Sequence, residues 1–380
     1  MNLCILVTHL LGTGHLRRAA VLGRAAAQAG ARVTILSGGM PVEAIETGGA
    51  ELVQLPPLRS DGVNFTTLLD ADGAIASDLY KQNRISLIRE TVAISRPDVL
   101  LTELYPFGRR VLADEFRAAI ETARALPRPA AVVSSIRDIL APPSKPKRVA
   151  QTEAVLAKFY DAVLVHSDPA VVPLSASWPV SDSIAERLRY TGFVAPAMEA
   201  DTAPSATSDG TGEIIVSAGG GNVGLPLFTS ACGAARLLPN VHFRLLVGAE
   251  PMRADLTSTA PANVTVEPLR PDFRALLSRA ACSLSMCGYN TAMDILQTGV
   301  PALFVPFDEG NEVEQTLRAQ SLAKRPAIAM MQACDLEPAQ LAAELGKLCA
   351  APRRQPDNTG FDGARRSVEI LKELADARPS

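Results

Sequence analysis

The sequence lacks the features that mark several classes of protein. Its 37 basic and 40 acidic residues leave a net charge of −3, without the basic excess of a dedicated nucleic-acid binder, so we expect no nucleic-acid partner. No apolar run approaches the roughly 20 residues of a membrane span. The apolar start from Met1 to Val7 is short and is soon followed by His9 and Arg17, which argues against a signal peptide. We therefore expect a cytoplasmic protein whose contact with the inner membrane face, if any, is peripheral.

The six cysteines also lack the spacing of a metal or redox site. No pair forms a CxxC motif and no His/Cys cluster has zinc spacing, so we expect free cysteines and no bound metal. The hydrophobic fraction of 47% with 20% charged residues is that of a folded globular chain. A length of 380 residues is comfortable for two cores.

What is present is an alternation of strand-like and helix-like segments, which predicts α/β units with parallel sheets covered on both faces. A stretch rich in Pro, Ala, Ser, Thr, Asp and Gly, without apolar periodicity, indicates a linker. We predict a Rossmann-like domain over residues 1–194, the linker over 195–212, a second Rossmann-like domain over 213–358 and a terminal helix over 359–380 that could pack on either. The expected strands are residues 3–7, 33–36, 51–55, 99–102, 130–134, 162–165, 213–217, 242–247, 264–266, 281–285, 302–305 and 327–330.

A glycine turn follows the first strand in each of the two halves. Gly12 and Gly14 precede His15 at the start of a helix, where the backbone can approach a ligand and the helix N-terminus favours an anion. His15 could accept a proton from a hydroxyl near neutral pH, or simply hold the turn. The second turn suits backbone N–H groups that wrap a diphosphate; the alternative is a plain flexible loop. It contains Gly219, Gly220, Gly221 and Asn222.

The segment from Cys287 to Gln315 carries the most specific pattern. A strand ending near Ser285 leads through Gly288 into a helix that begins with Asn290, Thr291 and Asp294. A carboxylate one turn into such a helix can accept both hydroxyls of a ribose. Gly299-Val300-Pro301 then starts another strand, and after it Glu314 and Gln315 could bind sugar hydroxyls. As alternatives, Asp294 is a surface charge and the acidic loop is simply solvated.

This segment resembles glycosyltransferase family 28, which includes the N-acetylglucosaminyltransferase that completes the lipid-linked peptidoglycan precursor. The family pattern Ser-Gly-x-x-Thr-x-x-Glu, Gly-x-Pro-x-x-x-x-Pro, Gln-Gln has Cys287 for the serine, Asp294 for the glutamate and Glu314-Gln315 for the pair. The N-terminal turn is similar to the family's Gly-Thr-Gly-Gly-His, one glycine short. The whole chain also resembles a bacterial group of predicted glycosyltransferases with the same Thr-His-Leu-Leu-Gly-Thr-Gly-His-Leu-Arg-Arg start.

The resemblance implies a GT-B fold, with two doubly wound domains facing across a cleft, an inverting mechanism and no essential metal. The nucleotide-sugar is then a co-substrate rather than a cofactor, and UDP is the nucleotide that the family suggests. The acceptor is not implied; a lipid-linked molecule and a small metabolite both stay open. Asp294, one methylene shorter than glutamate, and Glu314 mark where the donor preference departs from that of the family.

The remaining candidates are softer. Glu103 and Asp138 follow strands at the edge where an acceptor would lie, and either could serve with His15 as the catalytic base, or form a salt bridge or helix cap. Asp70-Ala71-Asp72 matches a metal motif of a different fold, and we interpret it as a loop. The pairs Arg17-Arg18 and Arg109-Arg110 could meet an anionic acceptor, although solvated charge is the simpler interpretation.

Two other functions compete with sugar transfer. A nucleotide-sugar epimerase or hydrolase would share the donor site and use carboxylates around the sugar, with Asp70, Asp72, Glu103 and Asp138 as candidates. A dinucleotide oxidoreductase or a non-catalytic binding protein is disfavoured, because the first turn lacks the third glycine and no acidic residue ends the second strand.

Overall fold

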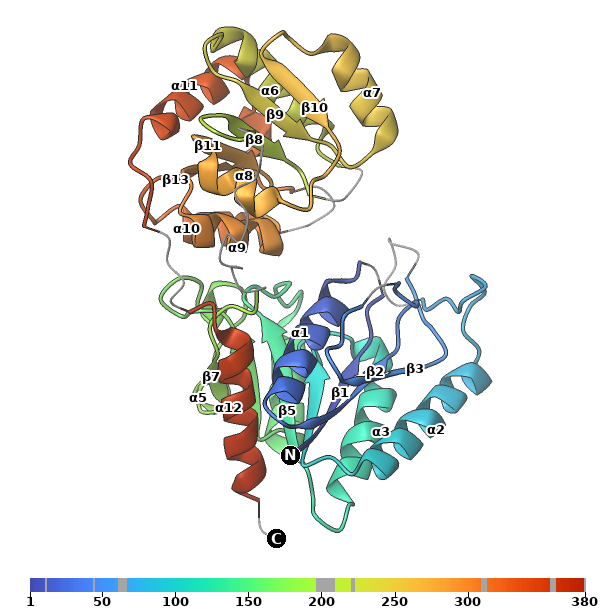
Figure 1. Cartoon of the computed structure of the whole chain (residues 1–380). Helices are drawn as coiled ribbons and strands as arrows, with labels where there is room; N and C mark the ends of the chain where they lie inside the picture. Colours follow the sequence, from blue (N-terminus) through green and yellow to red (C-terminus); the bar gives the residue numbers. More distant parts are fainter. Residues whose placement is uncertain are drawn as a thin grey trace. The chain divides into compact units, whose positions relative to one another are not determined.

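The computed structural model describes residues 1–10, 12–43, 45–60, 67–195, 209–219, 223–308, 313–355 and 360–378. It divides into two compact units, Met1–Ala197 with Gly360–Ser380, and Met198–Thr359. Each unit is built on one parallel sheet with helices packed against it (Figure 1). The predicted α/β class with doubly wound domains is confirmed.

The sheet of the N-terminal unit has seven strands in the order β3-β2-β1-β4-β5-β6-β7, all paired in parallel. The strands are β1 (Asn2–Val7), β2 (Arg32–Ser37), β3 (Glu51–Gln54), β4 (Val99–Glu103), β5 (Ala131–Arg137), β6 (Ala162–His166) and β7 (Leu188–Tyr190). The helices are α1 (Gly14–Gln28), α2 (Asp78–Ser95), α3 (Ala113–Arg124), α4 (Pro146–Phe159), α5 (Asp182–Ala185) and α12 (Gly363–Asp376), with 3-10 turns η1 (Arg110–Leu112) and η2 (Leu174–Ala176). The three-residue strand β7 has no counterpart among the predicted strands.

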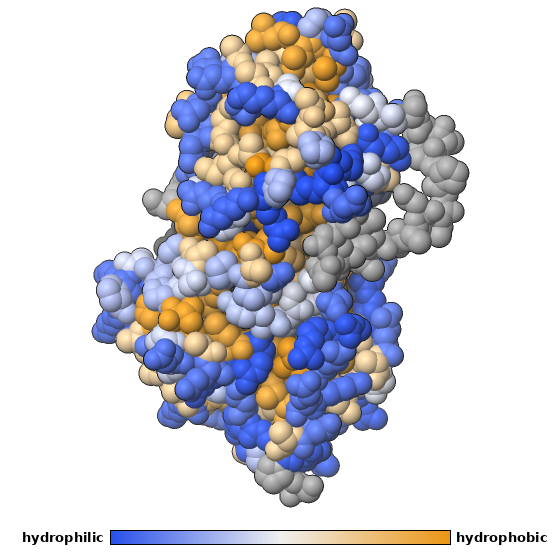
Figure 2. Space-filling view, turned by 90° about the vertical axis from the view of Figure 1, so that its left-hand side faces the viewer, coloured by the Kyte–Doolittle hydropathy of each residue, from blue (hydrophilic) through white to orange (hydrophobic). Residues whose placement is uncertain are grey.

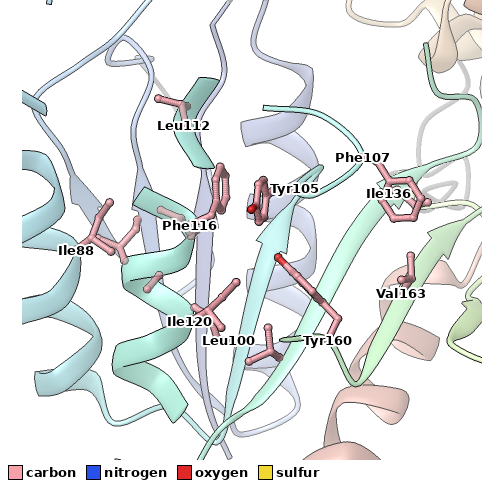
Figure 3. Packing of buried hydrophobic residues seen from close by; sticks show 14 of the residues in the cluster. Ile88, Leu100, Tyr105, Phe107, Leu112, Phe116, Ile120, Ile136, Tyr160 and Val163 are labelled. Atoms are coloured by element: carbon pink, nitrogen blue, oxygen red, sulfur yellow. The ribbon is translucent and has the colours of Figure 1, made fainter. Parts of the chain in front are cut away.

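Both faces of this sheet are buried, which explains why its strands are nearly continuous apolar runs. Because successive strand residues point to opposite faces, Leu3 and Ile5 pack with α1 and α12, whereas Leu6 and Leu100 pack with α2 and α3. On the second face the rings of Tyr105 and Phe116 stack with centroids 4.7 Å apart (Figure 3). These two cores hold the carboxyl ends of the strands in place.

The C-terminal helix α12 packs on the N-terminal unit. Its Val368 and Leu371 are buried in the same core as Leu16 and Leu22 of α1. At its start, the N–H of Gly363 donates to the carbonyl of Phe193 at 3.2 Å. The sequence left the place of this helix open, and the structure assigns it to the first unit.

The C-terminal unit has a six-stranded parallel sheet in the order β10-β9-β8-β11-β12-β13. The strands are β8 (Ile214–Ser217), β9 (Phe243–Leu246), β10 (Val264–Glu267), β11 (Cys282–Ser285), β12 (Ala302–Phe304) and β13 (Ile328–Met330). The helices are α6 (Leu225–Leu237), α7 (Glu250–Thr259), α8 (Phe273–Arg279), α9 (Tyr289–Thr298), α10 (Glu314–Leu322) and α11 (Pro338–Cys349), with the 3-10 turn η4 (Ala333–Asp335). The predicted strands of this half lie within about one residue of these bounds.

The end of the predicted linker belongs structurally to this unit. Asp209 forms ion pairs with Arg244 at 3.3 Å and with Arg270 at 2.8 Å, and Gly210 packs on Leu276. Residues 196–208 of that linker lie outside the described residues. Aspartate and glycine in a polar stretch gave no sign of these ion pairs, because the partners are distant in sequence.

Among the described helices, none combines the length and apolar character required to cross a bilayer. On the face drawn in Figure 2, hydrophobic residues form separate groups bordered by hydrophilic ones.

Candidate functional site

Each sheet reverses its strand order at one point, and the candidate residues gather there. In the N-terminal unit the reversal lies between β1 and β4, and in the C-terminal unit it lies between β8 and β11. The loops that follow the two strands at such a point diverge, which leaves a crevice where ligands of open α/β sheets bind. The turns with Gly12 and Gly14 after β1 and with Gly288 after β11 occupy these points.

His15 lies in the first turn of α1 and faces the end of β4. Its Nδ1 is 2.9 Å from Oε1 of Glu103. Gly12 has a φ of +36°, and among the described residues no atom beyond the chain neighbours lies within 4 Å of the place that a Cβ would take at Gly12 or Gly14. The turn before His15 therefore leaves open space for a ligand.

Glu103 is buried at the end of β4, and both of its oxygens accept hydrogen bonds. Oε1 accepts from Arg18 and His15, and Oε2 accepts from the hydroxyl of Ser135 at 2.7 Å. Burial raises its pKa, but Arg18, His15 and Ser135 outweigh burial and bring that pKa to about 2. Glu103 is therefore an ionised acceptor that orients its neighbours. With its oxygens engaged and its pKa low, Glu103 is better placed to orient His15 than to act as the base itself.

The ionisation of His15 follows from the same contacts. Burial lowers its pKa to about 4, although Glu103 acts in the opposite direction. At neutral pH the imidazole is thus neutral, and its Nδ1–H donates to the carboxylate of Glu103. The lone pair is then on Nε2, so the pair forms a base together with the group that holds it in the right tautomer.

Two further carboxylate candidates of this unit, Asp138 and Asp70, are placed differently. Asp138 follows β5 and is fully buried, so it does not present its carboxylate at the surface beside His15. The carboxylate of Asp70 accepts from the backbone N–H groups of Asp72 at 3.0 Å and Ala74 at 2.9 Å. Asp70 thus stabilises a turn, as we expected for this loop.

Arg109 belongs to one of the two arginine pairs for which the sequence suggested either an anionic acceptor or solvated charge. Its Nε donates to the carbonyl of Thr8 at 2.7 Å, and its backbone is left-handed with a φ of 57°. Within the described ranges its guanidinium makes no further hydrogen bond. Burial lowers its pKa, and the charge of Glu103 raises it. Arg109 therefore offers two amino groups to an anion near His9 and His15, and its charge lowers the pKa of both histidines.

In the C-terminal unit, glycines shape the turn after β8. Gly219 has a φ of +78° and open space where a Cβ would lie, and its N–H donates to Ser217 at 3.2 Å. Gly224, with a φ of +109°, caps α6. The other predicted residues of this turn, Gly220, Gly221 and Asn222, lie outside the described residues.

The start of α9 is the second anion-favouring feature of this unit. Gly288 caps the helix, its first turn contains Asn290 and Thr291 without an acidic residue, and no side chain caps it in the part of the chain described. Open space lies where a Cβ of Gly288 would be. The first N–H groups of the helix and its dipole therefore favour a negative group at this place.

Asp294 is half-buried one turn further along α9, where Arg274 of α8 holds one of its oxygens. Nε and Nη2 of Arg274 donate to Oδ1 at 2.8 and 2.7 Å. Oδ2 accepts no hydrogen bond among the described residues. Burial raises the pKa of Asp294, and Arg274 opposes that rise. The aspartate is thus oriented, with one oxygen left for a ligand hydroxyl.

The helix α10 contributes differently from what the motif suggested. The side-chain oxygen of Gln315 accepts from the N–H of Phe307 at 3.2 Å, so this amide holds the loop after β12. Glu314 is half-buried at the first position of α10. The buried Arg318 donates to the carbonyl of Cys287 at 2.9 Å and lies 5.8 Å from the ring of Tyr289. We had not identified Arg318; its position one turn after Glu314 on the buried helix face was the available signal.

Known proteins resemble this chain both in the sequence of its C-terminal part and in the fold. Residues 227–372 match the glycosyltransferase family 28 C-terminal domain. Solved structures support the same fold over nearly the whole chain: the glycotransferase of kitacinnamycin (TM-score 0.67, 19% identity) covers 98% of this chain and 99% of its own, and Acinetobacter baumannii MurG (TM-score 0.62, 17% identity) covers 98% and 100%. The chain therefore has the GT-B fold, and its C-terminal part is similar to the C-terminal domain of glycosyltransferase family 28.

Among curated relatives, the chain is 32% identical over 165 residues to the UDP-N-acetylglucosamine--N-acetylmuramyl-(pentapeptide) pyrophosphoryl-undecaprenol N-acetylglucosamine transferase of Mesorhizobium japonicum. That alignment covers 41% of this chain and 44% of the relative. The relative of the same description from Rhodopseudomonas palustris is 24% identical over 247 residues, which is 60% of this chain and 66% of its own length. The chain thus spans about half the length of the first of these relatives.

Proposed function

We propose that this protein transfers a sugar from a nucleoside-diphosphate donor, a UDP-sugar, to an acceptor hydroxyl with inversion at the anomeric carbon. The observation that carries the proposal is the pair of His15 and Glu103 at the strand-order reversal, which leaves the basic Nε2 of a neutral imidazole for a substrate proton. Single displacement needs one base on the acceptor and one stabiliser of the leaving group. The N-terminal unit supplies the first and the C-terminal unit the second.

In the proposed reaction, Nε2 of His15 takes the proton of the acceptor hydroxyl as its oxygen bonds to the anomeric carbon. The bond from that carbon to the diphosphate oxygen breaks, and the nucleoside diphosphate leaves with both electrons. The N–H groups at the start of α9 act as fixed dipoles toward the developing charge, and Oδ2 of Asp294 accepts a ribose hydroxyl. With this stabilisation we expect no essential metal, and EDTA should leave the rate unchanged.

The acceptor side favours an anionic molecule, because Arg109 offers its amino groups beside His15. A lipid-linked phosphate or a phosphorylated small metabolite would both fit this charge. Ile75, three residues before α2, and Leu79, in its first turn, are 73% and 72% exposed, and these apolar side chains support peripheral contact with a membrane. Sedimentation with vesicles of anionic lipid tests this: wild type should bind, and a variant with both Ile75→Ser and Leu79→Ser should stay in solution. Equal binding of the two would refute it.

The experiment for the main proposal has two steps. A thermal-shift panel of nucleotide-sugars should raise the unfolding midpoint with the true donor, since a ligand that binds only the folded state stabilises it. Transfer is then measured with that donor for wild type, His15→Ala and Asp294→Ala. If both variants keep full transfer activity, the assignment is wrong.

The alternative of an epimerase or hydrolase has less support from the geometry. Glu103 is ionised and fully engaged, Asp138 is buried, and Asp70 stabilises a turn, so the carboxylates are not arranged around one sugar ring. Incubation with the donor alone separates the two functions. Turnover without an acceptor would favour the alternative.

A further inference from the structure

The polar contacts of Glu103 continue inward through three buried residues that the proposed function does not use. Ser135 Oγ is 2.7 Å from Oε2 of Glu103 and 2.9 Å from Nε2 of His166, and Nδ1 of His166 is 2.9 Å from Oγ1 of Thr191. Ser135 and His166 are fully buried and Thr191 is 3% exposed. This series of hydrogen bonds runs from β4 through β5 and β6 to Thr191, the residue that follows β7.

Strand periodicity explains why these groups share one face. Glu103, Ser135 and His166 each continue a row of alternate residues that is apolar until the carboxyl edge. The rows are Val99-Leu101-Glu103, Ala131-Val133-Ser135 and Ala162-Leu164-His166. A buried polar side chain is costly unless it is hydrogen-bonded, and an apolar residue would pack at these positions without that cost. In these rows, polar residues replace apolar ones only at the carboxyl end of the strands, next to the proposed catalytic base His15.

Counting protons fixes the direction of the hydrogen bonds that link Glu103, Ser135 and His166. The ionised Glu103 only accepts, so the single hydroxyl proton of Ser135 goes to Oε2. Ser135 then accepts from Nε2–H of His166. A neutral His166 has its lone pair on Nδ1, which lies 2.9 Å from Oγ1 of Thr191; that hydroxyl also lies 2.7 Å from the carbonyl oxygen of Gly192, so its proton is shared between the two acceptors. The reverse order would place the oxygens of Glu103 and Ser135 2.7 Å apart without a proton between them. Burial and the nearby charge of Arg18 lower the pKa of His166 to about 3, although Glu103 acts in the opposite direction, so this histidine is neutral as the count requires.

We propose that Ser135 and His166 are positioning residues for sugar transfer, which hold the carboxylate of Glu103 so that its Oε1 keeps His15 in the Nδ1–H tautomer. His15 then carries its lone pair on Nε2, toward the acceptor, while His166 is held in the opposite, Nε2–H, tautomer. The kinetic part of this inference rests on the proposed function. The two tautomers do not, because they belong to the unliganded protein.

The tautomers can be read directly by nuclear magnetic resonance. The chain has four histidines, so the ring nitrogens of ¹⁵N-histidine-labelled protein can be assigned by single substitutions. At neutral pH we expect Nδ1–H for His15 and Nε2–H for His166. An Nδ1–H tautomer of His166 in the folded wild type would overturn the proposal, whether or not sugar transfer is observed.

Variants test the positioning role. Ser135→Ala and His166→Phe should let the carboxylate rotate, shift part of the His15 population to Nε2–H, and lower kcat about 10-fold at unchanged donor KM, because only the reacting geometry is affected. Ser135→Thr keeps the hydroxyl, and the amide of His166→Gln can replace the Nε2–H donor. Both should keep kcat within about threefold of wild type.

Ser134→Ala is the matched control. Ser134 is equally buried in β5 but points to the other face, where its hydroxyl donates to the carbonyl of Tyr105 at 2.8 Å. It should lose stability like Ser135→Ala without any change in the His15 tautomer or in kcat. If Ser135→Ala and His166→Phe match Ser134→Ala in both readouts, the role is structural and the proposal fails. Should these two variants not fold, a loss of the His15 tautomer in the folded His166→Gln and Ser135→Thr would equally overturn it. If instead the tautomers are as expected but no donor is turned over, the proposed function fails and the positioning geometry stands.

Discussion

Two histidines of the N-terminal unit are buried neutral, yet their surroundings give them different tasks. His15 keeps one nitrogen at a partly open place and the other on Glu103, whereas both nitrogens of His166 are bonded inside the protein. Burial lowers the pKa of each, to about 4 and about 3. A base that is already neutral at pH 7 needs no deprotonation before it acts, and the buried carboxylate stabilises the imidazolium formed in the transition state.

Glu103→Gln tests this arrangement at the residue scale. The substitution removes the hydrogen bond and the charge that raise the pKa of His15, while Arg18 and Arg109 continue to lower it. The acid limb of kcat/KM, expected near pH 4 in wild type, should move to lower pH, and kcat should fall by about 100-fold or more because the imidazolium loses its partner. Rates from pH 3.5 to 8 measure both effects. Glu115→Gln, which breaks the buried ion pair with Arg84, is the control and should leave the limb in place; a shift toward higher pH in Glu103→Gln would contradict the prediction.

Arg109 yields a second prediction at this scale. Arg109→Gln removes a half-buried cation that we propose binds an anionic acceptor, so the KM for the acceptor should rise about 10- to 100-fold, in line with the loss of a charged hydrogen bond. The KM for the donor should not change. The exposed neighbour Arg110, which donates to the carbonyl of Phe107, is the control through Arg110→Gln. An unchanged acceptor KM in Arg109→Gln would show that this guanidinium does not bind the acceptor.

At the scale of elements, the two units share the same arrangement at the point where the strand order reverses. A strand ends, a glycine turn follows, and a helix begins with N–H groups that its own residues leave for a ligand. The turns were predictable because glycine after an apolar run is a local signal. The residues that complete each site were not, since Arg274 comes from α8, Arg318 from α10, and Ser135 and His166 from β5 and β6. Their neighbours are fixed by the order of strands in the sheet, which local patterns do not specify.

The prediction at this scale concerns Asp294 on helix α9. Asp294→Asn keeps the shape of the side chain but removes the charge that pairs with Arg274, so the oxygen facing the ribose is less firmly held. The donor KM should rise about 10-fold while kcat changes little, because the ribose contact is made equally in the ground and transition states. Initial rates over a range of donor concentrations measure this. Glu344→Gln, which loses a surface pair with Lys347 on α11, should behave like wild type; a large fall in kcat alone would contradict the ribose assignment.

At the scale of the whole molecule, the buried histidines couple stability to pH. The unfolded chain binds protons on these rings below about pH 6.5, whereas the folded chain does so only near pH 4 for His15 and pH 3 for His166. The free energy of unfolding must therefore fall as the pH drops from about 6.5 to 3. At pH 5 the loss is about 2 kcal/mol for each ring, from about 1.4 kcal/mol per unit of pKa shift.

His166→Gln removes one of these titrations. Denaturant unfolding at pH 7 and pH 5 should show a smaller loss of stability in the variant than in wild type. Equal losses would mean that His166 is not held neutral in the folded state.

The α/β class, with its alternating strands and helices, and the bounds of most strands could be predicted from the sequence. The unit on which the last helix packs could not. The apolar side of this helix, which includes Val368 and Leu371, could pack on either sheet, and the local sequence does not specify which one. β7 was missed for a related reason, because three residues are too few to show a period.

The return of α12 has a consequence for how the protein comes into being. The core of the N-terminal unit is closed by residues 363–376, which are synthesised after the entire C-terminal unit. While the chain grows on the ribosome, the face of the first sheet that awaits Val368 and Leu371 stays uncovered, and the second unit can complete its fold first. The part of the molecule that begins the chain is therefore the part that finishes folding last.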